Sequence, residues 1–285
     1  MALEQEKMDL VHKGILETVQ VFTKICDENN LKYLMTGGTL IGAVRHQGFI
    51  PWDDDMDIFM PREDYEKLLK IPQERLNENI KIKHYTNKDG NNQYLTIKFE
   101  NSDYKITKKS FEKIVKENLF IDIFPLDGFP NNFFLSVCHK ISLKWRMQMI
   151  RLARLQFYDK DQEISKKMNP LKKVLYGLDK FTRVFSSMNY VKQISKFEAE
   201  LKKYKYFESE KCFFAMGPYG MFREIYPKKL FEETKMYKFE NIELRGVIDY
   251  DRHLRQVYGD YMKLPPEEKR VCLHMEDIKY EGEKR

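Results

Sequence analysis

The 285-residue chain has few cysteines, glycines and prolines: 4, 13 and 10 respectively. Its cysteines, Cys26, Cys138, Cys212 and Cys272, lie at least 60 residues apart and form no C-x-x-C pair. The sequence therefore signals neither a zinc site nor a disulfide framework, and we expect small buried apolar thiols in a reducing compartment. The composition also argues against collagen-like repeats and disorder.

A hydrophobic run long enough to cross a bilayer is also missing. The most apolar stretches, 120–124 and 137–155, are short or interrupted by lysine and arginine. The first residues, MALEQEKMDL, have neither the basic start nor the apolar run of a secretory signal. We therefore expect a cytoplasmic protein without a transmembrane helix.

The residues that are present suit a protein with a full core: 42% are hydrophobic and 33% are charged. The net charge of +6 is uneven, because residues 140–211 contain 18 lysines and arginines against 8 acids. This basic block suits an anionic partner, such as a phosphate-rich polymer or a membrane surface, although solvated helix faces explain it equally simply and are our preferred interpretation. No nucleic-acid reader motif is present, and we expect no nucleic-acid partner.

Hydrophobic periodicity predicts an α+β fold with three parts: 1–130, a largely helical basic region at 131–211, and a small α/β part at 212–285. In the first part we expect helices at 8–29, 39–46 and 63–69 and strands at 32–36, 55–60, 94–100 and 119–124. A turn at 125–128 should close the last strand. Residues 133–206 are mainly helical in pattern, with a break near Pro170, and residues 237–245 and 249–258 predict a hairpin and a helix.

The most informative stretch is residues 36–60, TGGTLIGAVRHQGFIPWDDDMDIFM. Alternate residues of a strand face one side, so Asp55 and Asp57 should point together and share a divalent cation. Gly37-Gly38 before a helix offers backbone N–H groups to phosphate oxygens, and Arg45 is placed to contact a second phosphate. Each feature alone is more often a tight turn or a solvated loop. Together they indicate a metal-dependent transferase acting on nucleotide phosphates.

A third acid, Asp122, interrupts the apolar run LFIDIF. A buried carboxylate is costly unless it is paired or metal-bound, so Asp122 is expected to bind the metal or to accept a proton from an acceptor hydroxyl. An edge-strand aspartate facing water is the alternative. Asp127, in contrast, is explained by a P-L-D-G turn.

Three blocks of sequence closely resemble the LicD family of phosphocholine transferases, which is related to fukutin and fukutin-related protein. They are GGTLIGAVRHQGFIPWDDDMDIFMPREDYEKL, FIDIFPLDG and YGDYMKLPPEEKR, and the resemblance extends from about residue 31 to residue 274.

The resemblance implies a nucleotidyltransferase-like fold, with a mixed sheet and helices in residues 1–130 and a C-terminal part that completes the site. It implies transfer of phosphocholine from CDP-choline to a sugar hydroxyl of teichoic acid or lipopolysaccharide, with release of CMP. Asp55 and Asp57 look like Mg²⁺ ligands, with Asp122 the third carboxylate and Mn²⁺ the alternative metal. The positions expected to bind substrate are Gly37, Gly38, Thr39, Arg45, Trp52, Asp260 and His274. The metazoan relatives carry a cysteine-rich zinc element that is missing here, so we expect no zinc.

A choline head group would need aromatic faces or carboxylates, because it carries a permanent positive charge and no hydrogen-bond donor. Most of the 17 tyrosines and 20 phenylalanines must be core. The candidates near the motif-bearing segments are Trp52, Tyr94, Phe120, Tyr219, Phe222, Tyr258 and Tyr261.

The basic region contains one amphipathic stripe, formed by Val137, Ile141, Trp145, Met149 and Leu152. It is typical of a helix that packs on a domain, which we prefer, or of a helix lying on a membrane. The second interpretation matters because acceptors in the resembling family are often lipid-linked at the inner leaflet, which would make membrane contact peripheral.

Two alternatives to phosphocholine transfer stay open. The same fold and metal site serve transfer of ribitol phosphate, glycerol phosphate or a nucleotide. A non-catalytic polymer-binding protein is the other alternative, and the three acids argue against it.

Overall fold

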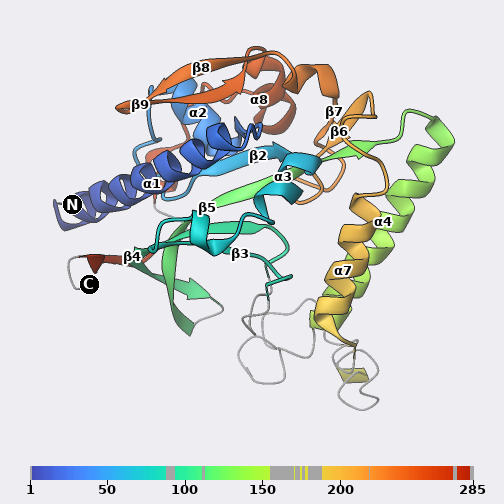
Figure 1. Ribbon diagram of the computed structural model, residues 1–285, viewed down its shortest axis with the longest axis horizontal. Coiled ribbons are helices and arrows are strands. Elements are labelled where there is room, and N and C mark those ends of the chain that lie inside the picture. Colours follow the sequence, from blue (N-terminus) through green and yellow to red (C-terminus); the bar gives the residue numbers. More distant parts are fainter. Residues whose placement is uncertain are drawn as a thin grey trace. The chain divides into compact units, whose positions relative to one another are not determined.

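The computed structural model describes residues 2–87, 94–110, 113–154, 170, 174, 177–178, 188–217, 219–271 and 275–282. The chain divides into two compact units, one formed by residues 1–129 and 205–285 and the other by residues 130–204. The first unit therefore joins the beginning and the end of the chain (Figure 1). The predicted α+β class is confirmed.

The larger unit is built on an eight-stranded mixed sheet with the central order β1-β2-β5-β4-β10. β3 pairs with β4, β6 pairs with β5, and β7 pairs with β6. β2 and β5 are parallel, and the other pairs of the sheet are antiparallel. The strands are β1 (Leu34–Met35), β2 (Asp57–Pro61), β3 (Ile80–Lys83), β4 (Ile97–Ser110), β5 (Lys113–Phe129), β6 (Lys211–Phe213), β7 (Ile225–Pro227) and β10 (Asp277–Tyr280).

The larger unit also contains a β-hairpin, α-helices and 3-10 turns. The hairpin, β8 (Thr234–Phe239) with β9 (Ile242–Val247), confirms the prediction for residues 237–245. The helices are α1 (Ala2–Glu28), α2 (Gly37–Arg45), α3 (Arg62–Leu68), α8 (Tyr250–Tyr258) and the 3-10 turns η1 (Gln73–Arg75), η3 (Lys228–Phe231) and η4 (Glu267–Lys269).

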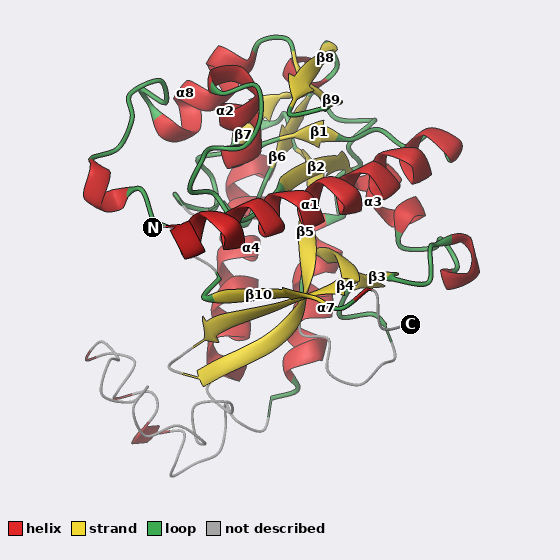
Figure 2. Cartoon of the chain, turned by 90° about the vertical axis from the view of Figure 1, so that its left-hand side faces the viewer, coloured by secondary structure: helices red, strands yellow, loops and turns green. Residues whose placement is uncertain are grey.

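α1 lies across one face of the sheet (Figure 2). Its apolar stripe, which includes Ile15, Val19 and Phe22, is fully buried, as the periodicity predicted. A Cβ atom at Gly14 would collide with Leu119 of β5 and approach Tyr104 of β4 to 3.0 Å, so glycine permits the close packing of helix on sheet.

Three local predictions are wrong. β2 begins at Asp57, so Asp55 lies in the loop before the strand. The turn expected at 125–128 is strand, because β5 continues to Phe129 and pairs there with β6. Cys138 is exposed, whereas Cys26 and Cys212 are buried, where burial raises the pKa of both thiols. Cys272 lies outside the described residues.

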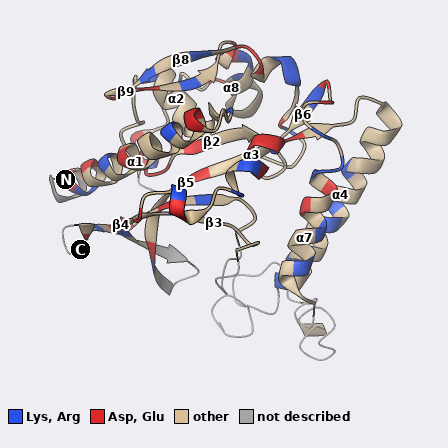
Figure 3. Cartoon of the chain, in the orientation of Figure 1, with Lys and Arg blue, Asp and Glu red and all other residues tan. Residues whose placement is uncertain are grey.

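The smaller unit contains α4 (Phe133–Ala153) and α7 (Tyr190–Leu201), which pack against each other. Their contact includes a hydrogen bond between Nδ1 of buried His139 and Oε1 of Glu200, 3.1 Å apart. Lysines and arginines lie along both helices (Figure 3). The stripe expected to pack is instead exposed at Val137, Ile141 and Trp145, because α4 buries Leu143, Ile150 and Ala153. The break near Pro170 falls among residues of which only isolated positions are described.

Within the described parts of the chain, no helix is both long and apolar enough to cross a membrane.

Candidate active site

Two neighbouring strands bring the predicted acids together. β2 and β5 run parallel with Asp57 paired to Asp122, and the backbone N–H of Asp122 donates to the carbonyl of Met56 at 2.9 Å. Neighbouring strands lie about 4.8 Å apart, and paired residues face the same side. The D-x-D segment and the LFIDIF segment, about 65 residues apart in sequence, thus place two carboxylates side by side.

Asp57 is the centre of a carboxylate group that also contains Asp53, Asp55 and Asp122. Burial raises the pKa of Asp57 well above its ordinary value, and the negative charges of Asp55, Asp122 and Asp53 raise it further. The ammonium of Lys98 opposes these effects without cancelling them. The ionised form of Asp57 is therefore destabilised by its surroundings.

The first turn of α2 lies directly against these acids. Gly37 has a φ of +56°, and a Cβ atom there would lie 2.7 Å from Asp57 Oδ2. A Cβ atom at Gly38 would collide with the carboxylate of Asp53. The two glycines thus form the start of the helix rather than a turn before it, and the helix presents its N-terminal N–H groups beside the carboxylates.

Thr39 has a positioning contact in this structure. Its Oγ1 accepts a hydrogen bond from the backbone N–H of Asp57 at 2.8 Å, so it ties α2 to the start of β2. This contact fixes the backbone of Asp57 relative to the glycines.

Lys98 is a site residue that sequence reasoning missed. It pairs with Asp122 in the antiparallel β4–β5 register, and its Nζ donates to Asp122 Oδ2 at 2.6 Å. The same ammonium lies 4.0 Å from the centre of the Phe120 ring. No local pattern could reveal Lys98, because its role depends on the register between two strands.

The carboxylate group fits a divalent cation in donor type and charge. Its donors are all oxygens, which Mg²⁺ and Mn²⁺ prefer. Asp122 Oδ1 is buried and, among the described residues, accepts no hydrogen bond of good geometry, although it lies 2.5 Å from Lys98 Nζ. In the described parts of the chain, however, no three acidic, histidine or cysteine side chains lie close enough together to hold an ion as they stand. Binding of a metal ion would therefore require the carboxylate side chains to move. In this structure Lys98 is the counter-ion of Asp122.

Two residues of the C-terminal part contact α2 and the acidic loop, which we define as residues 53–56. The backbone N–H of Met275 donates to Asp54 Oδ2 at 2.7 Å, and Asp54 is buried. Arg45 Nη1 donates to the carbonyl of Tyr261 at 2.8 Å. Burial lowers the pKa of Arg45, and the nearby charge of Asp53 opposes that change.

The other predicted substrate-binding residues are less central. Arg270 lies over the ring of Trp52 at 5.6 Å and covers one of its faces. Asp260 is exposed. Its described electrostatic interaction is with Arg255 and not with the carboxylate group around Asp57. His274 lies outside the described residues.

Tyr258 and Glu224 form a second group next to the acids. Tyr258 Oη would lie 3.5 Å from a Cβ atom at Gly37. Burial raises the pKa of Tyr258, and Asp57 and Glu224 raise it further. Glu224 is itself buried, which raises its pKa to about 7, and it follows no motif that the sequence analysis used. The ring of Tyr219 stands 5.6 Å from that of Tyr258 at 84°.

His253 contacts the residue that caps the start of α2. It is fully buried, with one ring nitrogen 3.1 Å from Oγ1 of Thr36, the N-cap residue of α2. Burial lowers the pKa of His253 to about 4, so the ring is neutral at pH 7. Its position inside the fold, rather than any ligand-like spacing, gives it this contact.

Known proteins resemble this chain over the same segments. Residues 30–150 match the family model LicD/FKTN/FKRP, nucleotidyltransferase domain. The chain is 31% identical over 264 residues to the lipopolysaccharide cholinephosphotransferase LicD of Haemophilus influenzae, which covers 92% of this chain and 94% of that protein. It is 36% identical over 120 residues to an uncharacterized protein of Rickettsia prowazekii, covering 41% and 39%. Human ribitol 5-phosphate transferase FKRP is 35% identical over 52 residues, covering 18% and 10%.

Proposed function

Because the chain belongs to the LicD family, we propose that it transfers phosphocholine from CDP-choline to a sugar hydroxyl of a cell-envelope glycopolymer and releases CMP. The polymer is a lipopolysaccharide or teichoic acid precursor. The full-length similarity to a lipopolysaccharide cholinephosphotransferase supports this choice over the polymer-binding alternative. The short similarity to a ribitol 5-phosphate transferase supports a related phosphotransferase as the second candidate.

The observation that carries the proposal is the pairing of Asp57 with Asp122 beside the first turn of α2. In the reaction, the acceptor oxygen attacks the phosphorus of phosphocholine, and the bond from that phosphorus to the CMP oxygen breaks. CMP leaves with the bonding electron pair, and a carboxylate, for which we propose Asp122, accepts the hydroxyl proton. The helix N–H groups at Gly37 and Gly38 hold phosphate oxygens.

We assign Mg²⁺, or Mn²⁺ in its place, to Asp55 and Asp57, with Asp122 as the third carboxylate. When bound, the cation would neutralise the charge that develops on the pyrophosphate. Its binding would also relieve the repulsion that raises the pKa of Asp57. Lys98 would then be free to turn from Asp122 toward a phosphate oxygen.

The surroundings of Tyr258 support choline as the alcohol. Several other aromatic candidates already have a cation of this chain near the ring: Trp52, Tyr94, Phe120, Tyr219 and Tyr261. After burial, the charges that raise the pKa of Tyr258 most are the negative ones of Asp57 and Glu224. We propose that Tyr258 and the carboxylate of Glu224 hold the trimethylammonium group.

We also propose that the protein works in the cytoplasm, peripherally at the inner membrane surface. α4 supports this because its described sequence has four basic residues and no acid, while Phe133 and Phe134 are 83% and 71% exposed. Removing charge at Lys140, Lys144, Arg151 and Arg154 should weaken binding to anionic liposomes. Unchanged binding would exclude this membrane role.

The first experiment measures CMP release from CDP-choline, CDP-ribitol, CDP-glycerol and CDP-ethanolamine, with Mg²⁺ or with EDTA. We expect metal-dependent release from CDP-choline, and a loss of about tenfold in apparent affinity for that donor in Glu224→Gln. Release from CDP-ribitol alone would favour the second candidate. Release from no donor, together with no thermal stabilisation by any of them, would refute the donor assignment.

A further inference from the structure

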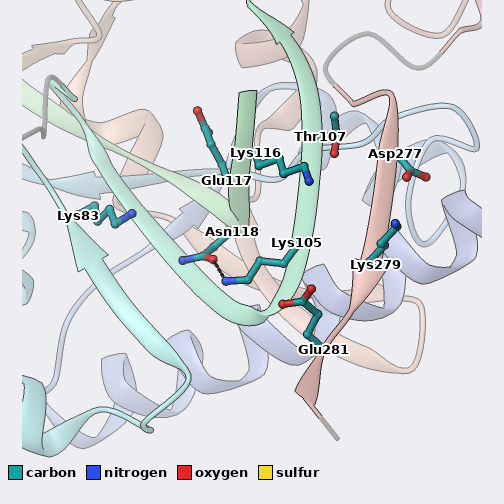
Figure 4. Close-up of a pocket in the computed structure, with 9 residues that line it drawn as sticks. All are labelled: Lys83, Lys105, Thr107, Lys116, Glu117, Asn118, Asp277, Lys279 and Glu281. Carbon is teal, nitrogen blue, oxygen red and sulfur yellow. Dashed lines mark hydrogen bonds between the residues drawn. The ribbon is translucent and has the colours of Figure 1, made fainter. Parts of the chain in front are cut away.

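The larger unit carries a polar groove away from the carboxylate group. Its volume is about 570 Å³, and it is formed by β3, β4, β5 and β10 (Figure 4). The residues that line it are Lys83, Lys105, Thr107, Lys116, Glu117, Asn118, Asp277, Lys279 and Glu281. Neither the family motifs nor the proposed donor site uses any of them.

The groove and the carboxylate group lie on the same face of β5. Alternate residues of a strand share a face, and Asp122, Phe120, Asn118 and Lys116 alternate along β5. The intervening Leu119 and Ile121 are fully buried on the opposite face, where Leu119 packs against α1.

Contacts between side chains make this face continuous. Lys98 joins Asp122 to Phe120, and Asn118 Nδ2 donates to Glu100 Oε2 at 2.9 Å. Lys116 is six residues from Asp122, a distance of about 20 Å along a strand. An extended chain of several sugars could therefore reach from the groove to the acids.

The groove has a small excess of positive charge. It is lined by four lysines and three acids. Lys7 pairs with Asp277 at 2.9 Å, and Lys83 is itself taken up by buried Glu100 at 2.9 Å, which leaves three lysines against Glu117 and Glu281. Lys105 donates to Asn118 Oδ1 at 2.5 Å, which Figure 4 shows as a dashed line. Lys116 and Lys279 are exposed residues of the groove lining.

We propose that this groove binds the phosphate or carboxylate groups of the glycan acceptor, and that the β5 face guides the acceptor hydroxyl to the carboxylate group. The inference rests on the proposed function, because it names the substrate class that the second half of that reaction uses. The acceptor is therefore an anionic glycan rather than a neutral one.

The test compares two acceptors, a phosphorylated oligosaccharide and the same oligosaccharide without phosphate. In the double variant Lys116→Glu with Lys279→Glu, the KM for the phosphorylated acceptor should rise about tenfold, the size expected when two partly exposed ion pairs become repulsive. The KM for the neutral acceptor should stay within about twofold, and added salt should raise the native KM in the same direction. CMP release without acceptor reports the donor site separately.

A matched control reverses two exposed lysines that lie off this face, Lys24 of α1 and Lys229 of η3. It changes the net charge equally and should leave both acceptor KM values unchanged. Equal changes in the groove variant and the control, or equal changes for both acceptors, would overturn the proposal.

Direct calorimetric titration with the phosphorylated oligosaccharide keeps the inference separate from the proposed function. If no CDP-alcohol is consumed, the proposed function fails. Titration would then still support the groove if binding weakens only in the groove variant. It would overturn the groove if the native protein and the variant bind alike or neither binds.

Discussion

β5 carries two aspartates, Asp122 and Asp127, that meet opposite surroundings. Asp127 is buried and receives two hydrogen bonds from Arg62, 2.6 Å from Nε and 2.9 Å from Nη2. Asp122 lies among the acids around Asp57 and is opposed by the ammonium of Lys98. Asp127 is thus matched in charge, whereas Asp122, near the middle of the strand, lies in an excess of negative charge.

The difference separates an acid with a structural partner from one to which we assign a role in the reaction. A buried carboxylate with a bidentate guanidinium partner needs no further ligand, and its removal leaves an unpaired charge. A group of carboxylates that destabilise one another is a high-energy arrangement in the empty protein, and it becomes favourable when a cation binds. Buried acids along one strand are therefore best classified by their neighbours.

The largest effect should come from a substitution in the carboxylate group around Asp57. Asp57→Asn should lower metal-dependent CMP release at least about thousandfold, because the central oxygen donor is lost. Thermal stability should not fall, since the substitution removes a carboxylate whose ionisation is unfavourable. Turnover and melting temperature, measured on the same sample, check both parts. Retained turnover would remove Asp57 from the reaction.

The pair formed by Arg62 and Asp127 should behave in the opposite way. Arg62→Met should lower the free energy of unfolding by about 4 kcal/mol, because Asp127 is left buried and unpaired. Urea unfolding measures this loss, and turnover per folded molecule should stay within about twofold. Adding Asp127→Leu should restore most of the stability. A loss of turnover without a loss of stability would contradict the structural role.

His253 extends the comparison to a buried base that has no counter-ion among the described residues. Its pKa is lowered from 6.5 to about 4, so the unfolded chain gains a proton at a higher pH than the folded one. The stability that the neutral ring contributes is complete above pH 6.5 and is lost as the pH falls toward 4, by up to about 3 kcal/mol. Unfolding measured across this range should show a shallower acid limb for His253→Gln. Equal slopes for both proteins would show that another group titrates there.

The smallest effect concerns two glycines that share a positive φ. Gly37 and Gly259 have φ values of +56° and +69°, but only Gly37 faces a carboxylate, and Gly259 has open space within 4 Å of a Cβ atom. Gly37→Ala and Gly259→Ala should each destabilise the fold by about 1 kcal/mol. Only Gly37→Ala should also lower CMP release, by about tenfold. Equal turnover in the two variants would show that the close approach at Gly37 is unimportant.

Local pattern was sufficient to predict much of the scaffold. The stripe of α1, the hairpin β8–β9 and the strand that carries Asp57 follow from periodicity within short windows. The polar interruption of LFIDIF was enough to single out Asp122, because an acid inside an apolar strand needs a reason.

Long-range pairing explains what the sequence could not show. Lys98 meets Asp122 only through the β4–β5 register, and Arg62 meets Asp127 only because β2 lies beside β5. The segment Pro125–Gly128 has the residues of a turn, and its extension as a strand depends on pairing with β2 and β6. Glu224 has no local signature, since its burial comes from tertiary packing.

The hydrogen bond from Met275 to Asp54 also has a consequence for how the protein is made. Its two residues are 221 positions apart, and β10, which follows Met275, pairs with β4 near the middle of the chain. A ribosome adds about 5–20 residues per second, so the acidic loop is synthesised at least about ten seconds before its partner. A nascent chain in that interval carries the acids without the contact that holds their loop. Competence for catalysis therefore arises late in synthesis, when the last strand joins the sheet.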